Sequence, residues 1–446
     1  MRSLILLLLT LSLPLQGQPL WPAPGQAPWA DHWYQLLVDL QFSAERPADA
    51  AQANLASERL VRFQASLQGR SPDPTLQKLT QIGSADELQA WVNGIAPSYQ
   101  AFERLRAALH EELKLASLPR PDFTEISAYS LGQAHKELVP LRRLLAARLG
   151  ETLPPHLVNR DVWDPPLIDA LRRFQRESQL PESGRLTPET IAALSMDNQA
   201  RLAAIRFSLR QWLQLPPKLS GDAILVNLPH YQLMALEGKK VHMVLPVIIG
   251  APETPTPRFN SRFSTVTLNP SWTPPWSIIR GELLPAYRRD SNSLKRQGFE
   301  LIDPKTPGSL PLPWQSVAPG QLPDLLSQYQ LKQKPGSNNA LGTARLNLVN
   351  SNAIFLHDTP NRKLFRRSQR ALSHGCIRIQ DIDRLLSYLE RNIPLPERQK
   401  LQYAKKSRDS FTQRLGTTAK VYIVYMPAWP KGDNGASIAA DIYNLI

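Results

Sequence analysis

Apolar residues recur at helical spacing through the first third of the chain. Trp33, Leu36, Leu37 and Leu40 stand at positions i, i+3, i+4 and i+7, which form one face of an α-helix. Similar stripes follow, and they comprise Leu60, Phe63 and Leu67, then Tyr99, Phe102, Leu105 and Leu109, then Leu138, Leu141, Leu144, Leu145 and Leu149. Stripes of this kind bury against one another to form a core. The pattern predicts a helical scaffold domain over residues 29–155.

A smaller helical unit is predicted over residues 160–197. Its first helix has an apolar face made of Leu167, Leu171 and Phe174. A turn with proline and glycine comes next. Thr187 then occupies the position of an N-cap, with Pro188 as the first residue of a second helix. We therefore expect a small three-helix domain here.

The pattern changes to short strands after Ala223. Apolar runs of strand length recur between proline and glycine residues, and they occupy 224–228, 233–236, 241–249, 264–269 and 421–425. Many short strands with this punctuation predict a β-sandwich or barrel over residues 220–446. A polar, proline-rich stretch at about 279–334 breaks the pattern, which predicts a helical, loop-rich cap inserted in this domain. The whole chain is thus predicted to be a multidomain α+β protein.

Residues 1–17 have the pattern of a secretory signal peptide. Arg2 is followed by the leucine-rich run 4–13, which is too short to span a bilayer comfortably, and Pro14 ends it. The alternative is retention of this segment as an amino-terminal anchor, which would associate the protein with a membrane. Both interpretations predict an exported protein.

The composition adds an excess of positive charge. Of the 446 residues, 42% are hydrophobic and 20% are charged, and the formal net charge is +14. Such a charge attracts an anionic partner, although it also serves solubility. Nucleic acid is not an expected partner, because the chain is exported and has no basic run interleaved with aromatic residues. An anionic polymer outside the cell or a lipid surface fits better.

The candidate chemistry lies in the run Ser373-His374-Gly375-Cys376, which contains the only cysteine of the chain. His357 stands 19 positions before this cysteine, at the end of an apolar run. A thiol becomes a strong nucleophile once a neighbouring base converts it to thiolate, and histidine is the usual base. Gly375 permits a tight turn whose amide groups could point toward an acyl oxygen. These residues predict a cysteine–histidine catalytic pair.

Two other interpretations of Cys376 fit the residues alone. A lone cysteine is often a small buried hydrophobic residue. His357, His374 and Cys376 are also zinc-ligand types, but no fourth ligand stands at metal-like spacing nearby, so no metal is expected. Export favours a working thiol, because exported proteins commonly carry paired cysteines and this chain has a single one.

The stretch from His357 to Ser373-His374-Gly375-Cys376-Ile377-Arg378 resembles the signature of the L,D-transpeptidase (YkuD-type) catalytic domain. Other stretches resemble landmarks of that family, and they are 226–229, 246–250, 256–257, 269–278, 334–342 and 425–443. The resemblance implies the family's fold for 220–446, with the capping insert found in its large, multidomain Gram-negative branch. Residues 160–197 resemble a peptidoglycan-binding type 1 domain, with Glu182-Ser183-Gly184 where that family usually has Asp-Gly.

The resemblance also implies a role for each residue of the site. Cys376 is the expected nucleophile and His357 its base, with the backbone carbonyl of Asp358 orienting the imidazole. The residues alone suggest instead the Asp358 carboxylate for this task, or a turn cap at that position. Amides of Gly375 and Cys376, helped by His374, are expected to form the oxyanion hole. The expected substrate-binding residues are Ser373, Arg378, Trp272 and Asn339, the last two from landmarks on either side of the cap.

The reaction of that family is the expected function. Its donor is a peptidoglycan tetrapeptide stem, which the thiol attacks at meso-diaminopimelate with loss of D-alanine. The diaminopimelate amine of a second stem then resolves the thioester and forms a 3→3 crosslink. No cofactor is expected, and the expected location is the periplasm, at the inner membrane for an anchored form. A cysteine carboxypeptidase or endopeptidase of the same fold, a lipoprotein-to-wall transferase and a non-catalytic wall-binding scaffold remain open.

Overall fold

The computed structural model describes residues 21–446 except 117–119, 179, 196–197, 239, 307, 319, 392, 408 and 433. The predicted signal segment 1–17 lies outside the described residues. The chain forms two compact units. One comprises the described residues up to Pro217 together with Pro430–Ala436, and the other comprises Lys218–Trp429 and Ser437–Ile446. None of the described helices is long and apolar enough to cross a membrane.

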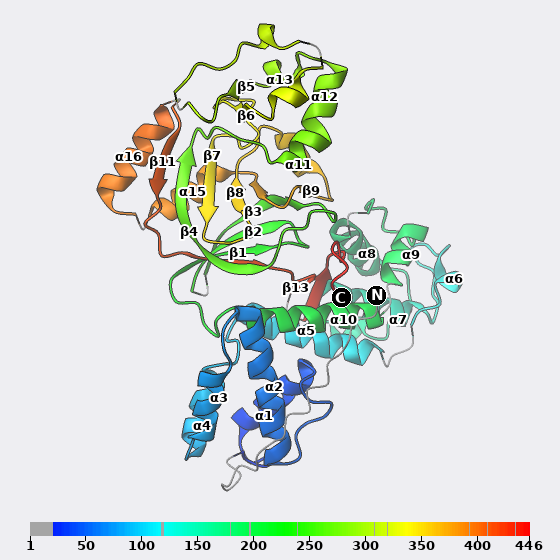
Figure 1. The fold of residues 1–446 in the computed structure, drawn as a ribbon. Coiled ribbons are helices and arrows are strands. Elements are labelled where there is room, and N and C mark those ends of the chain that lie inside the picture. The colour runs from blue at the N-terminus through cyan, green and yellow to red at the C-terminus, as the bar shows by residue number, and fades with distance from the viewer. Residues whose placement is uncertain are drawn as a thin grey trace. The chain divides into compact units, whose positions relative to one another are not determined.

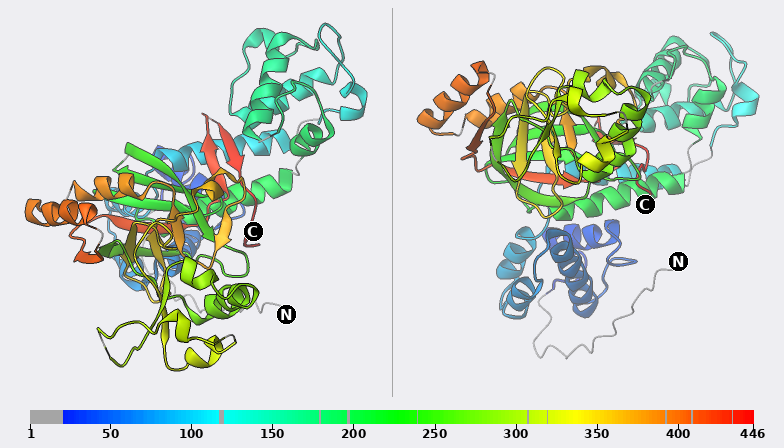
Figure 2. Two further views of the ribbon diagram at one scale, coloured as in Figure 1. Left: turned by 90° about the horizontal axis from the view of Figure 1, so that it is seen from above. Right: turned by 45° about the horizontal axis from the view of Figure 1, so that its top comes forward.

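The first unit is helical, as the apolar stripes predict (Figure 1). Its helices are α1 (Pro28–Asp39), α2 (Ala50–Gln68), α3 (Asp73–Thr80), α4 (Ala85–Asn93), α5 (Gln100–Ala116), α6 (Phe123–Ile126), α7 (Leu138–Leu149), η1 (Pro155–Leu157), α8 (Pro165–Glu177), α9 (Pro188–Leu194), α10 (Asn198–Gln211) and η2 (Trp212–Gln214). The leading stripe is buried, since Trp33, Leu36, Leu37 and Leu40 are each at most 1% exposed. Helices α5 and α10 lie side by side in both views of Figure 2.

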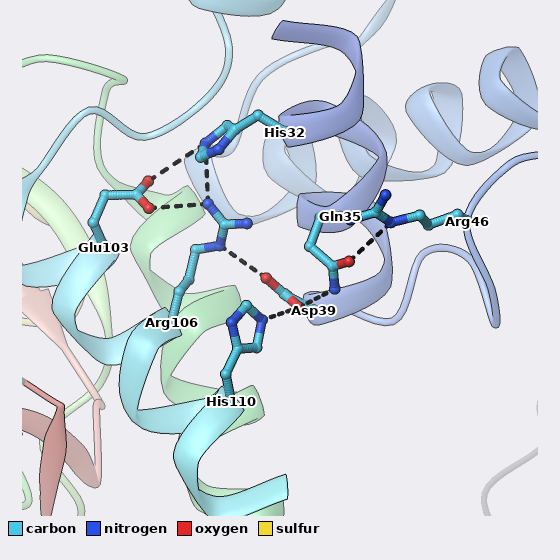
Figure 3. Close-up of polar contacts among 7 residues, drawn as sticks. All are labelled: His32, Gln35, Asp39, Arg46, Glu103, Arg106 and His110. Atoms are coloured by element: carbon cyan, nitrogen blue, oxygen red, sulfur yellow. Dashed lines mark hydrogen bonds and ion pairs between the residues drawn. The ribbon is translucent and has the colours of Figure 1, made fainter. Parts of the chain in front are cut away.

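Buried charges join the helices of this unit. Asp39 on α1 is 3% exposed and accepts hydrogen bonds from Arg106 Nε and Gln35 Nε2, each at 2.9 Å (Figure 3). Glu112 on α5 is likewise buried, and it pairs with Arg148 of α7 and with Arg201 of α10, the latter at 2.7 Å. Burial by itself would raise the pKa of Glu112, but the two guanidinium groups outweigh it and hold that pKa below its usual value. These ion pairs therefore hold α5 in a defined position against α1, α7 and α10.

Helices α7, α8 and α9 share one hydrophobic core. Leu141 and Leu145 of α7 pack in the same cluster as Leu171 of α8 and Leu194 of α9. The predicted N-cap is confirmed, because the Thr187 side chain accepts a hydrogen bond from the amide of Thr190. The small helical unit thus includes α7. The apolar stripe of α7 shows that one face is buried, but it does not show which helices pack against that face.

A ten-stranded sheet forms the centre of the second unit. Its strands are β1 (Asp222–Asn227), β2 (Gln232–Glu237), β3 (Lys240–Gly250), β4 (Phe259–Leu268), β7 (Ala344–Leu348), β8 (Phe355–His357), β9 (Ala371–Ser373), β10 (Ile377–Ile379), β11 (Phe411–Arg414) and β12 (Lys420–Val424). Their order is β10-β8-β7-β4-β12-β1-β2-β3-β9, with β11 on β4. Because β10 also pairs with β3, the sheet closes into a barrel, which confirms the predicted fold class.

Two helices and a hairpin complete the path of the chain after β10. Helix α15 (Ile382–Glu390) and helix α16 (Leu395–Lys406) precede β11. The hairpin of β13 (Ala428–Lys431) and β14 (Gly435–Ile438) follows β12, and its tip belongs to the first unit.

The insert between β4 and β7, here called the cap, has a core of its own (Figure 1). It contains α11 (Trp276–Ile278), the π-helical turn η3 (Ile279–Leu283), α12 (Leu284–Arg289), α13 (Ser293–Arg296), β5 (Phe299–Ile302), η4 (Trp314–Ser316), α14 (Leu322–Leu325) and β6 (Gln330–Gln333). Leu294, Phe299 and Leu322 are at most 2% exposed. The sequence predicts a polar cap of helices and loops, whereas the structure adds the antiparallel pair β5–β6 and this core. Its apolar residues are too irregularly spaced between prolines to show a period.

The cap joins the barrel through a narrow neck. The amide of Trp272 donates to the carbonyl of Gln333 at 2.8 Å, and the amide of Gln333 donates back at 2.7 Å. The two ends of the insert therefore leave the barrel side by side, and the insert begins a few residues before the predicted position 279.

Candidate active site

The parallel pairing of β8 with β10 brings the predicted base and nucleophile together. Leu356 lies opposite Ile377, and His357 lies opposite Arg378. Side chains alternate between the two faces of a strand, so His357 and Arg378 project from the same face of the sheet. The same register places Cys376, one residue before β10, on that face opposite Phe355. Residues 358–376 connect the two strands, so the chain leaves β8 and comes back to pair with it as β10.

The His357 imidazole is buried and held by the main chain. Its Nδ1 lies 2.6 Å from the carbonyl oxygen of Asp358, and the residue is 5% exposed. A carbonyl oxygen only accepts hydrogen bonds, so Nδ1 carries the proton and Nε2 keeps its lone pair. Burial, aided by the positive charge of Arg378, lowers the pKa of His357 to about 3. The ring is therefore neutral at any pH near neutrality.

The Asp358 carboxylate points to other partners. Its Oδ2 accepts from the Thr343 amide at 3.0 Å and from the Thr343 hydroxyl at 3.1 Å, and its Oδ1 accepts from Arg362 at 2.9 Å. Gly342 makes room for this arrangement, because a Cβ there would lie 2.3 Å from Oδ2. The sequence left two groups of Asp358 that could orient the imidazole, its main-chain carbonyl and its carboxylate. In the structure, the main-chain carbonyl contacts the ring.

Ser373 fastens the turn that carries the thiol. Its hydroxyl donates to the Cys376 carbonyl at 2.6 Å and accepts from the Gly375 amide at 3.2 Å. Thr256 donates to the Gly375 carbonyl at 2.7 Å, and Gly375 itself has a φ of 109°, which a side chain would strain. In this structure the Gly375 amide donates to Ser373, and its expected part in an oxyanion hole stays a prediction. The Cys376 amide has no protein acceptor among the described residues.

The Cys376 thiol is partly buried and sits between positive charges. Its Sγ lies 3.9 Å from the Ala353 carbonyl oxygen. Burial raises the pKa of this thiol above its ordinary value, while the Phe355 amide, Arg378 and Arg345 oppose that rise. Within the described structure, no hydrogen bond links the thiol to His357. The resting pair is thus a neutral thiol beside a neutral imidazole, as catalytic hydrogen bonds often form only once substrate is bound.

The remaining predicted residues lie around this centre or at the neck of the cap. His374 is exposed and its Nε2 lies 3.2 Å from the Glu282 carboxylate, which belongs to η3 of the cap. Trp272 packs on Phe299 of the cap core, with ring centroids 6.0 Å apart. Asn339 is 1% exposed and its amide group is engaged by the Lys334 carbonyl and the Leu341 amide. The contacts of Trp272 and Asn339 therefore shape the neck of the cap.

Arg345 is a residue of the site that the sequence did not indicate. It lies directly opposite His357 on β7, on the side away from Arg378. The alternating burial of Ala344–Leu348 shows that its side chain leaves the same face as that of Asn347. No local sequence pattern shows that the strand of Arg345 lies beside the strand of His357. Only the strand register of the structure shows that these two residues are paired. Among the described residues, no three His, Cys, Asp or Glu side chains cluster as a metal site would require.

Comparison with known proteins identifies the domain. Residues 221–423 match the family model described as the L,D-transpeptidase catalytic domain, YkuD. This region is similar to a YkuD-type L,D-transpeptidase catalytic domain. Residues 140–194 match the model described as "Putative peptidoglycan binding domain", which takes in α7 as well as α8 and α9. The match therefore begins before the predicted boundary at residue 160.

Relatives of the transpeptidase domain were found among curated proteins and solved structures. A Haemophilus influenzae protein named "Putative L,D-transpeptidase" is 32% identical over 226 residues, which are 50% of this chain and 44% of that protein. The chain thus spans less than half the length of this relative. An L,D-transpeptidase structure from Mycobacterium smegmatis is 13% identical with a TM-score of 0.19, covering 46% of this chain and 58% of its own. One from Stackebrandtia nassauensis is 14% identical with a TM-score of 0.23, covering 69% and 97%. These structural likenesses are too weak to bear on the chemistry.

The contact between Gly342 and Asp358 predicts a specific effect of one added methyl group. Gly342→Ala should displace the Asp358 carboxylate and, with it, the carbonyl that orients His357. We expect a loss of about 1–3 kcal/mol in unfolding free energy, because the carboxylate loses buried partners. Activity should fall by at least about tenfold, since small misplacements of catalytic groups are costly. Thermal unfolding and reaction rates measure the two effects.

Gly221→Ala is the matched control for this substitution. Both glycines have a positive φ, 61° at Gly342 and 82° at Gly221, but only Gly342 has a neighbour in the way of a Cβ. The two variants share the backbone strain and differ in the clash. Equal losses in both would show that the space beside Asp358 is unimportant.

Proposed function

We propose that this protein is a peptidoglycan L,D-transpeptidase that forms 3→3 crosslinks between meso-diaminopimelate residues through a thioester on Cys376. The observation that supports it best is the register of β8 and β10, which places this thiol and His357 on the same face of the sheet. The Nδ1 of His357 is bonded to a main-chain carbonyl, so Nε2 keeps the lone pair that accepts a proton. The match of residues 221–423 to the transpeptidase family supports the substrate class.

The first half-reaction would transfer an acyl group to sulfur. As the thiol approaches the carbonyl carbon of the donor's diaminopimelate, its proton passes to Nε2 of His357 and the C–S bond forms. The unoccupied amide of Cys376 is placed to stabilise the oxyanion. Because burial makes the imidazolium a strong acid, it then readily protonates the amine of the departing D-alanine. The C–N bond breaks, and a thioester remains.

The second half-reaction would reverse the roles of the same groups. The diaminopimelate amine of a second stem attacks the thioester carbon, and His357 takes the proton that the amine loses. The C–S bond breaks and the imidazolium returns its proton to sulfur, which restores the neutral pair. With water in place of the amine, the same steps give hydrolysis. The cap is a natural device for favouring transfer, because exclusion of water protects a reactive acyl group.

The expected substrate contacts can be assigned more narrowly. Ser373 is 3% exposed and bonded to its own turn, so we assign it to holding the thiol in place. Arg378 has a buried Nε without a hydrogen-bond partner among the described residues, which suits it to a carboxylate of the donor stem. Glu282 of the cap contacts His374 of the motif, so the cap reaches the edge of the site where an acceptor stem would arrive.

The small helical domain is proposed to hold the cell wall. A groove of about 1260 Å³ is lined by α7, α8, residues 150–157 and the hairpin tip, and its walls carry Arg142, Arg172, Arg173, Arg176 and Lys431. These cationic groups outnumber the acidic ones there, which are Glu151, Asp169 and Glu177. A stem peptide presents carboxylates of the complementary sign. We also propose that the protein acts in the periplasm, where this substrate is found.

The thiol mechanism predicts complete dependence on Cys376. Cys376→Ala should abolish crosslinked dimer formation from purified muropeptides, since no other cysteine exists in the chain. Meropenem should add one adduct to the wild-type protein, as acylation of the thiol requires. Mass spectrometry of the muropeptide products and of the intact protein measures both.

Cys376→Ser serves as the control for shape at this position. It keeps a hydroxyl in place of the thiol, so it should fold normally and lack both activities. Dimer formation at the wild-type rate in either variant would refute the thioester. A meropenem adduct on Cys376→Ala would place the reactive group elsewhere.

The cap predicts a separation of acylation from transfer. Residues 274–332 can be replaced by a short Gly/Ser linker, because the neck brings Trp272 and Gln333 into direct contact. The cap has its own core, so its removal as a whole leaves the barrel strands paired. Crosslinking should fall by at least about tenfold through loss of stem positioning, while the rate of meropenem acylation changes by less than about threefold.

The comparison with a point variant sharpens this test. Glu282→Ala removes the contact with His374 and the negative charge that acts on Arg378, while the residues of the cap core are unchanged. A soluble linker variant that crosslinks as fast as wild type would show that the cap is dispensable for transfer.

The groove predicts charge-dependent wall binding. Arg173→Glu reverses a positive charge in the groove, where Arg173 pairs with Glu151 at 2.9 Å. Co-sedimentation of the full chain with purified sacculi should weaken by about threefold or more at low salt. Arg104→Glu makes the same change of charge on an exposed residue outside the groove and should bind as wild type does. Equal losses in the two variants would mean that net charge, and not the groove, determines binding.

A further inference from the structure

Arg345, His357 and Arg378 form a row across three neighbouring strands. Arg345 on β7 pairs with His357 on β8, and His357 pairs with Arg378 on β10. Directly paired residues project from the same face of a sheet, and in an antiparallel pair such as β7–β8 their Cβ atoms are about 4.5–5.5 Å apart. The catalytic imidazole thus stands between two guanidinium groups, and the thiol lies on the same face two residues before Arg378.

The Arg345 side chain is positioned by an aromatic ring. Its guanidinium carbon lies 5.0 Å from the centroid of the Phe355 ring, and that ring lies 5.5 Å from the ring of His357. Phe355 occupies the position beside Cys376 in the β8–β10 register. A guanidinium group that stacks in this way is fixed toward the thiol side of the row.

Arg345 has no acidic partner to neutralise it. Its Nε is buried and has no hydrogen-bond partner, and no ion pair involves it among the described residues. Arg345 is half-buried, so a positive charge there without a counter-ion carries part of the cost of desolvation, and such charges are common where an anion forms. The positive charges that act on the thiol are Arg345 on β7 and Arg378 on β10. The other titratable groups of the neighbouring elements are the neutral His357 on β8, His374 in the turn, and Glu282 of the cap, which acts on Arg378 and contacts His374.

We propose that Arg345 is a positioning residue that stabilises the thiolate of Cys376 from the side of His357 opposite to Arg378. Its positive charge lowers the free energy of the anion that remains when the thiol loses its proton. It also disfavours a positive charge on His357, which keeps the resting imidazole neutral. No bond to Arg345 forms or breaks in this step. The inference deepens the proposed role of Cys376 as nucleophile, and it rests on that role.

A purely structural role for Arg345 makes a different prediction. If the side chain only covers Phe355, an uncharged residue of similar shape would serve equally well. The charge would then have no effect on the ionisation of the thiol. The titration of Cys376 therefore separates the two roles, and it needs no peptidoglycan.

The test is the pH dependence of thiol alkylation in the full chain. Cys376 is the only cysteine, so the rate of modification by iodoacetamide between pH 6 and pH 10 reports its thiolate alone. R345Q and R345M should each raise the midpoint by about half a unit to one unit, since removal of a nearby positive charge disfavours the anion. The thiolate fraction at neutral pH then falls about threefold to tenfold. R345K, which keeps the charge, should stay near the wild-type midpoint.

Arg391→Gln is the matched control. Arg391 also stacks on an aromatic ring, that of Tyr388, at 4.1 Å, but it does not act on the thiol. This variant should leave the alkylation midpoint unchanged. A wild-type midpoint in whichever of R345Q and R345M folds, judged by near-ultraviolet circular dichroism, would overturn the proposal.

The same variants distinguish this inference from the proposed function. A raised midpoint in R345Q and R345M supports the role of Arg345, whatever acceptor the enzyme uses. Loss of crosslinking without a raised midpoint would assign Arg345 to substrate binding instead and overturn the inference. Failure of the wild-type protein to crosslink would count against the proposed function and would leave the titration readable.

Discussion

The parallel pairing of β8 with β10 is the contact on which the active site depends. Each of these strands has only three residues, so neither would be stable without its neighbours. Strand β7 supports β8 from one side, and β3 supports β10 from the other. The pairing of β10 with β3 also closes the barrel. Closure of the sheet and assembly of the thiol–imidazole pair are therefore one structural event.

Burial sets the chemistry of this pair, and the main chain compensates for it. A buried histidine favours its neutral form, and a buried thiol does likewise. The hydrogen bond from His357 to the Asp358 carbonyl selects the tautomer without adding a negative charge that would make the ring more basic. The Asp358 carboxylate is directed away to Thr343 and Arg362. One residue thus orients the ring through its backbone and anchors its loop through its side chain.

The cap is a separate subdomain inserted between two strands of the barrel. The cap has its own core and is tethered by a single backbone bridge between Trp272 and Gln333, so it can vary in shape without disturbing the sheet. Glu282 of the cap forms an exposed pair with His374 of the catalytic motif, and such a pair adds little stability. A pair this weak leaves the cap able to move relative to the motif.

The sequence by itself determined the features that depend on neighbours in the chain. Helical stripes located the core of the first unit, and Thr187 marked the start of α9, because periodicity and capping act over a few residues. The single cysteine and His357 gave the candidate chemistry. What only the tertiary structure decided is which groups meet: that Arg345 stands beside His357, that Ser373 takes the Gly375 amide, and that α7 joins α8 and α9. The physical reason is that strand register and hydrogen-bond partners are set by contacts between residues far apart in the chain, which no local pattern encodes.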